Sequence, residues 1–434
     1  MAQSGCDPAT YFTRLENETV VPRGFRFFSD SLSFVPDERP ASNPLGMNVS
    51  AVVSDEDDTR AVGVTTQNRF PGAPVRLARE RLPGGRLRGV VVNNRVSNVA
   101  TPAGYHDAVT IADTFARAFS LPETEVLSVS TGVIGWSLPV EEMVPVITGI
   151  ADHEVSPAAF ARGIMTTDRY PKLVSAADPG GPRILGVAKG AGMIEPDMAT
   201  MLAFFVTDAI VDATVMDHVF RRVVDETFNT ISVDSDQSTS DMVILLANGA
   251  SGVSLDADAF EALLRPRAEA LVEDIVRNGE GTAHVIEVSI AGVRDRRLAR
   301  EIGKHIVNSP LVKTAIYGND PNVGRILAAC GDALHHLDRD KTIDASTMTI
   351  AIFGEAVYRD GAFHLDGARE RRLSEALIRA SFDPAFSGCP QPSETVDIVI
   401  TFGDADRTPT VPPVRVLGSD LSYEYVRENA DYRS

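Results

Sequence analysis

One short segment of the chain combines the residue types that nucleophilic acyl transfer needs. The segment from Lys189 to Asp208 reads KGAGMIEPDMATMLAFFVTD, a turn followed by a nearly continuous apolar run, and Thr200 lies at the junction. A threonine hydroxyl is a weak nucleophile, but cleavage before it would expose the residue's own α-amine, with a pKa of about 8, as an adjacent base. The pattern therefore predicts either a self-activating Thr200 after cleavage at Ala199–Thr200, or a β-branched residue that begins a buried strand.

Other catalytic and cofactor motifs are not met. Lys189-Gly-Ala-Gly resembles a phosphate-binding loop, but Glu195 stands where the dinucleotide fingerprint needs a glycine, and no Gly-Lys-Ser/Thr sequence occurs. The eight histidines lack the spacing of a zinc site, and the Gly-x-Ser-x-Gly motif of serine hydrolases is missing. We therefore expect neither a metal nor an organic cofactor.

The composition narrows the class of protein. The 434 residues carry a formal net charge of −19, and 44% of them are hydrophobic, which is enough apolar material for folded domains. Such a negative charge repels phosphate backbones, so nucleic acid is not an expected partner. The three cysteines, Cys6, Cys330 and Cys389, are widely spaced and odd in number, which predicts a reducing, cytoplasmic location without a disulfide framework. The longest apolar run, residues 198–206, is too short to span a membrane, so no membrane partner is expected.

The hydrophobic periodicity predicts a mixed α/β chain. Apolar residues at helical spacing cover 108–119, Ser156-Pro157 marks a helix start, and a helix from about 257 should end at Asn278-Gly279. Short β-branched runs predict strands at 90–92, 126–129, 242–246, 284–290, 348–353 and 396–402. Residues 1–45 contain four prolines, and we interpret them as an irregular arm ahead of two bodies, 46–199 and 200–434.

The segment that contains Thr200 resembles the signature of the ornithine acetyltransferase (glutamate N-acetyltransferase) family. Further matches follow in family order from about residue 20 to the end of the chain: 22–25, 130–135, 164–168 with 171–172, 228–241, 274–281, 307–314, 320–325 and 425–434. The resemblance implies an α/β (α+β mixed), two-lobed sandwich like that of the N-terminal-nucleophile hydrolases, with a strand-bearing second lobe. It also implies self-cleavage before Thr200 into α and β chains that assemble as an α₂β₂ heterotetramer.

The same resemblance implies a reaction in arginine biosynthesis. Thr200 would take the acetyl group of N²-acetyl-L-ornithine as an acyl-enzyme and pass it to L-glutamate, in a ping-pong mechanism without a cofactor. Thr131 and Gly132 match the oxyanion pair, and such donors are typically worth about 3 kcal/mol each. The residues that match substrate-binding positions are Thr166, Lys189, Glu280, Asn429 and Ser434.

Each of these residues also fits a plainer role when it is taken alone. Thr131 and Gly132 could form a strand-ending turn, and Thr166 an Asx or helix-capping turn. Lys189 and Glu280 could be solvated loop residues, while Asn429 and Ser434 lie at a chain end, where fraying is common.

Three departures from the family pattern bear on the substrate. Val323 stands where relatives commonly carry tryptophan, and both 93–98 and 195–197 differ from the usual sequences. A paralogue of specialised metabolism with another amine acceptor therefore stays open, because the loss of a whole indole can change a pocket's selectivity. So do an N-acyl amino acid hydrolase or aminopeptidase with the same nucleophile, and an uncut binding protein.

Overall fold

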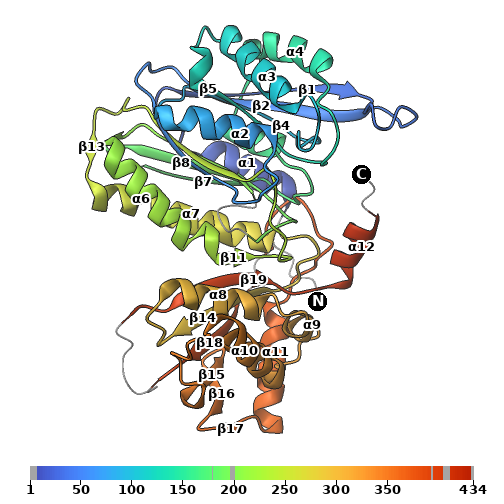
Figure 1. Ribbon diagram of the computed structural model, residues 1–434, viewed down its shortest axis with the longest axis vertical. Coiled ribbons are helices and arrows are strands. Elements are labelled where there is room, and N and C mark those ends of the chain that lie inside the picture. The colour runs from blue at the N-terminus through green and yellow to red at the C-terminus, as the bar shows by residue number, and fades with distance from the viewer. Residues whose placement is uncertain (1–6, 178, 196–200, 392–393, 404–410, 432–434) are drawn as a thin grey trace. The chain divides into compact units, whose positions relative to one another are not determined.

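The computed structural model describes residues 7–177, 179–195, 201–391, 394–403 and 411–431 (Figure 1). The cleavage site expected at Ala199–Thr200 and the C-terminal Ser434 lie outside these ranges. The described residues form a mixed α/β structure, as the periodicity predicts, and they divide into two compact units. The larger unit comprises 7–229 and 236–275, and the smaller unit comprises 230–235 and the residues from 276 onward.

Two five-stranded sheets form the framework of the larger unit. The first sheet has the strand order β5-β4-β2-β1-β6, and the second has the order β3-β12-β9-β8-β7. The strands of the first sheet are β1 (Phe25–Phe34), β2 (Leu45–Ser54), β4 (Gly89–Asn93), β5 (Val126–Ser130) and β6 (Glu154–Val155). Those of the second are β3 (Arg60–Thr65), β7 (Lys172–Ala177), β8 (Arg183–Lys189), β9 (Leu202–Thr207) and β12 (Met242–Ala247).

Helices accompany both sheets of this unit. They are α1 (Pro8–Glu18), α2 (Ala73–Arg81), α3 (Gly104–Ala118), α4 (Val140–Gly149), α5 (Pro157–Gly163), α6 (Ala213–Glu226) and α7 (Ala257–Arg277), and the short strands β10 (Ile210–Val211) and β13 (Ser254–Leu255) pair with each other. Figure 1 shows α3 and α4 beside the first sheet and α6 and α7 along the second. Helix α7 ends just before Asn278, where the sequence predicts its stop.

Helix α5 joins the inner faces of the two sheets. It begins as expected at Ser156, whose hydroxyl accepts a hydrogen bond from the backbone N–H of Ala159. The Phe160 ring lies 5.3 Å from that of Phe27 in the first sheet and 6.1 Å from that of Phe204 in the second, measured between ring centroids. Edge-on contacts of this kind add to the burial of apolar surface, so one aromatic core serves both sheets.

The segment expected to be an irregular arm is regular over most of its described length. Helix α1 is capped by the Asp7 side chain, and β1 pairs with β2 along its whole length. The four prolines mislead because they flank these elements: Pro22 precedes β1, and the others fall between β1 and β2. Proline lacks a backbone donor, but at such positions none is required by a sheet.

A single seven-stranded sheet forms the smaller unit. Its order is β11-β19-β14-β18-β15-β16-β17. The strands are β11 (Ile231–Ser232), β14 (Val285–Ala291), β15 (Thr349–Ile352), β16 (Glu355–Arg359), β17 (Ala362–Phe363), β18 (Val396–Thr401) and β19 (Val414–Ser419). The helices are α8 (Arg296–Val307), α9 (Pro310–Tyr317), α10 (Val323–Leu337), α11 (Gly367–Ala380) and α12 (Tyr423–Asp431).

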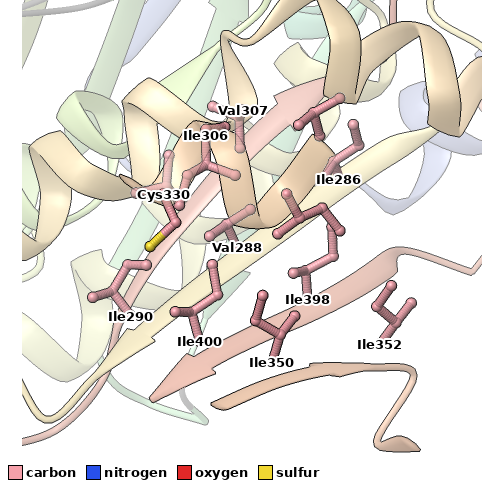
Figure 2. Packing of buried hydrophobic residues seen from close by; sticks show 14 of the residues in the cluster. Ile286, Val288, Ile290, Ile306, Val307, Cys330, Ile350, Ile352, Ile398 and Ile400 are labelled. Carbon is pink, nitrogen blue, oxygen red and sulfur yellow. The ribbon is translucent and has the colours of Figure 1, made fainter. Parts of the chain in front are cut away.

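The core of the smaller unit lies between this sheet and its helices (Figure 2). Alternate residues of three neighbouring strands point into it, and α8 and α10 close it from the other side. The labelled side chains are Ile286, Val288, Ile290, Ile306, Val307, Cys330, Ile350, Ile352, Ile398 and Ile400. Cys330 is a free, buried thiol whose pKa is raised to about 12 by burial, whereas Cys389 is disulfide-bonded, which the spacing of the cysteines does not predict.

Candidate active site

The end of β5 presents the two residues matched to an oxyanion site. Thr131 follows the strand directly, is buried, and donates its backbone N–H to the Asn93 carbonyl at 3.1 Å. Gly132 has a φ of +128°, and a Cβ atom there would lie 2.2 Å from the backbone carbon of Arg95. Only glycine fits so close an approach in this backbone conformation.

The loop after β4 holds this turn in place. The Asn93 amide donates to the Val96 carbonyl at 2.9 Å and accepts the Ser130 hydroxyl at 2.7 Å, while the Val133 N–H donates to the Arg95 carbonyl at 2.8 Å. Within the part of the chain that the structure describes, neither the Thr131 hydroxyl nor the Gly132 N–H donates a hydrogen bond. Two adjacent donors are therefore available to an oxygen that gains negative charge.

Lys189 and Thr166, two of the expected substrate-binding residues, come together in the larger unit. Lys189 ends β8, and its Nζ lies 3.3 Å from the Thr166 hydroxyl oxygen. An ammonium beside a hydroxyl supplies a positive charge and hydrogen bonds to a small carboxylate. The structure thus joins residues that are 23 positions apart in the sequence.

A buried carboxylate, Asp168, supports this pair. One oxygen accepts the Lys172 ammonium at 2.5 Å and the Gly190 N–H at 2.7 Å, and the other accepts the Thr166 N–H at 3.0 Å. Burial raises the pKa of Asp168, but the charges of Lys172 and Lys189 and the Gly190 hydrogen bond outweigh it and hold the pKa at about 2. Asp168 is therefore a carboxylate that fixes the residues on either side of the Thr166–Lys189 pair.

Sequence reasoning gave Asp168 no role, although it lies in a segment that matches the family. The available signal was the Asp-x-x-x-Lys spacing to Lys172, directly after Pro171. That spacing is common on exposed helices, where such pairs contribute little. Here Lys172 begins a strand and both side chains are fully buried, which only the tertiary structure reveals.

Strand β9, which follows the expected nucleophile, is the middle strand of the second sheet. Its first residue, Leu202, pairs with Lys189 of β8 and with Met242 of β12, and every residue of the strand is buried. The apolar run is therefore a strand, as expected. Thr200 itself precedes Leu202 by two positions and lies outside the described residues, as does Ala199.

Glu280 and Asn429, the remaining described candidates, meet in the smaller unit. The Asn429 amide, on α12, donates to Glu280 Oε2 at 3.0 Å and to the Tyr425 carbonyl at 3.1 Å. Glu280 lies in the turn after α7, where Gly281 has a φ of +63° and a Cβ atom on it would lie 2.1 Å from the Tyr425 backbone nitrogen. The tail is thus an ordered helix up to Asp431, while Ser434 is outside the described residues.

Comparison with known proteins agrees with these observations. A family model described as the ArgJ family matches residues 44–434, which is most of the chain. The chain belongs to this family. Self-cleavage is typical of ArgJ proteins, so the segment before β9 has the place in the sequence at which the family divides its precursors.

ArgJ relatives match over nearly their full length. Glutamate N-acetyltransferase Oat2 of Streptomyces clavuligerus is 41% identical over 95% of this chain and 98% of the relative. The arginine biosynthesis bifunctional protein ArgJ of Geobacter sulfurreducens is 37% identical over 95% of this chain and 99% of the relative. Among solved structures, the protein of the same name from Bacillus halodurans matches with 30% identity and a TM-score of 0.43, over 52% of this chain and 96% of that one.

The described residues offer neither a metal site nor a membrane-spanning helix. No cluster of three or more His, Cys, Asp or Glu side chains in these ranges could hold a metal ion. Among the described helices, none has the length and apolar character needed to cross a membrane.

Proposed function

We propose that this chain is a glutamate N-acetyltransferase that moves the acetyl group of N²-acetyl-L-ornithine to L-glutamate. The observation that carries the proposal is its 41% identity with a glutamate N-acetyltransferase over nearly the whole of both proteins. ArgJ relatives named for arginine biosynthesis match at similar length, which supports the same pathway and a cytoplasmic location.

Thr200 is the proposed nucleophile. After cleavage at Ala199–Thr200 its α-amine would accept the hydroxyl proton while the oxygen attacks the acetyl carbonyl carbon, and the ornithine amine would leave with a proton. Glutamate would then attack the acyl-enzyme and restore the hydroxyl. Support comes from β9, because a buried central strand gives the residue before it a rigid base.

Thr131 and Gly132 are proposed to stabilise the tetrahedral intermediate. The Thr131 hydroxyl and the Gly132 N–H would both donate to its oxyanion. Their support is geometric: the 93–98 loop fixes the turn, and in the described structure neither donor is used elsewhere. Preorganised donors of this kind cost no reorganisation during the reaction.

The substrate would be held by its charged ends. Lys189 and Thr166 suit the α-carboxylate, because an ammonium and a hydroxyl lie 3.3 Å apart there. Glu280 suits an amino group, and Asn429 holds the Glu280 carboxylate at 3.0 Å. Ser434 is proposed to complete the C-terminal part of the site, and the cleaved chains are proposed to form an α₂β₂ assembly without a cofactor.

One experiment tests the nucleophile and the cut together. Wild type should give two bands on a denaturing gel and should form N-acetylglutamate from N-acetylornithine and glutamate, whereas Thr200→Ala should give one band and no product. Thr200→Ser should retain slow cleavage and transfer, and Thr214→Ala, an exposed helix position, should behave as wild type. Full turnover by uncleaved Thr200→Ala would overturn the assignment.

The acceptor distinguishes transfer from hydrolysis. Acetate release from N-acetylornithine at the same rate with and without glutamate would replace the proposal with an amidohydrolase. N-acetylglutamate formation that depends on glutamate would support it, and the same assay with other amines tests a specialised acceptor.

A further inference from the structure

A buried histidine–aspartate pair lies beside the Glu280 turn. His284 is 1% exposed, and its Nδ1 lies 2.7 Å from Asp420 Oδ2. On the other side of the ring, Nε2 lies 3.2 Å from the Leu377 carbonyl oxygen and 3.3 Å from Asn319 Oδ1. Carboxylate and carbonyl oxygens only accept hydrogen bonds, so both ring nitrogens donate and the ring is an imidazolium.

The surroundings favour a positive charge at this place. Asp420 is fully buried and supplies the opposite charge, and Leu377 lies in the last turn of α11, where the carbonyl end of the helix dipole attracts cations. A buried ion pair is retained at some cost in desolvation, and its best supported use is to specify one arrangement of the chain. The arrangement that this pair specifies can be traced through the next residues.

Asp420 binds the chain on both sides of the histidine ring. Its Oδ1 accepts the Ala283 N–H at 2.9 Å, and its own N–H donates to the His284 carbonyl at 3.2 Å. The segment before β14 is therefore tied to the segment after β19 by backbone and side chain together. The first segment carries the Glu280 turn, and the second leads into α12.

The two segments remain in register up to Glu280. The Ser422 hydroxyl donates to the Gly281 carbonyl at 2.5 Å and accepts the Tyr425 N–H at 3.1 Å, which caps the start of α12. Farther along α12, the Asn429 amide reaches the Glu280 carboxylate. Three successive links, at Asp420, Ser422 and Asn429, thus join the same two stretches of chain.

We propose that the His284–Asp420 ion pair is a positioning device that sets the Glu280 carboxylate, and through it the affinity for the amino group of the substrate. The inference rests on the role proposed above for Glu280. Neither His284 nor Asp420 contacts the substrate: they act by holding the turn and α12 together. Loss of the pair should therefore weaken the binding of an amino acid more than it slows the chemical step.

The test uses the mature enzyme and L-ornithine as the probe. Asp420→Asn keeps the size of the side chain but sets an amide N–H₂ against a donor, either the His284 ring or the Ala283 N–H. We expect about a tenfold weaker Kd for L-ornithine by calorimetry, equal to about 1.4 kcal/mol, with a similar rise in KM and kcat within about threefold of wild type. His284→Asn removes the ring from the other side, should give the same pattern, and replaces Asp420→Asn if that variant does not fold.

A second ion pair of the smaller unit provides the matched control. His305 Nε2 lies 2.7 Å from Asp332 Oδ2, the same separation, but this pair is on the surface between α8 and α10. His305→Asn should leave Kd, KM and kcat unchanged. A general loss of fold would lower kcat by reducing the active fraction, and it would leave KM unaltered.

A double-mutant cycle with Glu280→Gln decides whether the pair acts through that carboxylate. The effects of Glu280→Gln and Asp420→Asn on ornithine affinity should be strongly non-additive, because the second change has nothing left to misplace. Full additivity, or Asp420→Asn and His284→Asn proteins that bind ornithine as wild type does, would overturn the inference alone. If Glu280→Gln itself binds ornithine normally, the role of Glu280 and this inference both fail, whereas a failed proposed function would show as absent acetyl transfer by wild type.

Discussion

Asp168 shows how a single buried charge can serve a site. Two lysines and two backbone N–H groups surround the carboxylate, and Lys172 has no exposure to water. A neutral amide in place of this carboxylate would leave a buried ammonium without its counter-charge. We expect Asp168→Asn to lower the free energy of unfolding by about 3–5 kcal/mol, and Asp168→Asn with Lys172→Met to recover much of that loss. Thermal unfolding of both variants is the measurement, and equal stabilities would contradict the expectation.

The same carboxylate predicts a dependence of stability on acid. Its folded pKa of about 2 lies below the ordinary value of 3.8, so ionised Asp168 stabilises the fold above about pH 4. That contribution is lost as the pH falls from about 4 to 2. The Tm of wild type should therefore fall more steeply over this window than the Tm of the Asp168→Asn, Lys172→Met protein, and parallel curves would show that another group dominates.

At Thr131, the hydroxyl is predicted to matter for rate and hardly for stability. Thr131→Ala removes one donor to the oxyanion and should lower kcat by about 10²-fold. Thr131→Ser keeps the donor and should retain most of the rate, and Thr148→Ala on the exposed face of α4 serves as the control. Steady-state kinetics beside a Tm measurement separate the two effects, since a Tm drop that accounts for the lost activity would argue for a structural role.

At the scale of elements, the packing of α8 on the sheet of the smaller unit depends on one glycine. A Cβ atom at Gly303 would lie 2.6 Å from Val416 Cγ2 on β19, so Gly303→Ala should destabilise by about 1–3 kcal/mol through overpacking. Gly331 of α10 is the matched control, because nothing lies within 4 Å of its Cβ position. Gly331→Ala should stabilise by about 0.5–1 kcal/mol through helix propensity, and chemical denaturation of the two variants should show opposite signs.

At the scale of the whole molecule, the compact units do not follow the proposed cut. Strands β8 and β9 lie on opposite sides of it in the sequence but pair along their lengths in one sheet, and β9 also pairs with β12. Cleavage at Ala199–Thr200 should therefore leave the two chains associated through the sheet. Size-exclusion chromatography under native conditions should give one species that contains both chains, and separation without denaturant would contradict this.

The sequence by itself determined much of the local structure and the family. Strands β4, β5, β12, β14, β15 and β18 and helices α3, α5 and α7 appear where periodicity, Ser156-Pro157 and Asn278-Gly279 predict them, because these signals act between near neighbours. Thr200, Thr131, Gly132 and Lys189 could be named because their segments resemble a known signature over a length that the family model also matches.

Tertiary structure alone decided which distant residues meet. No local pattern announces that Asp168 lies under Lys189, that His284 faces Asp420, or that β1 pairs with β2 across a proline-rich connection. These contacts depend on the register of strands far apart in the chain. Their energy comes from burying charges and apolar surface together, which has a value only once the chain has folded.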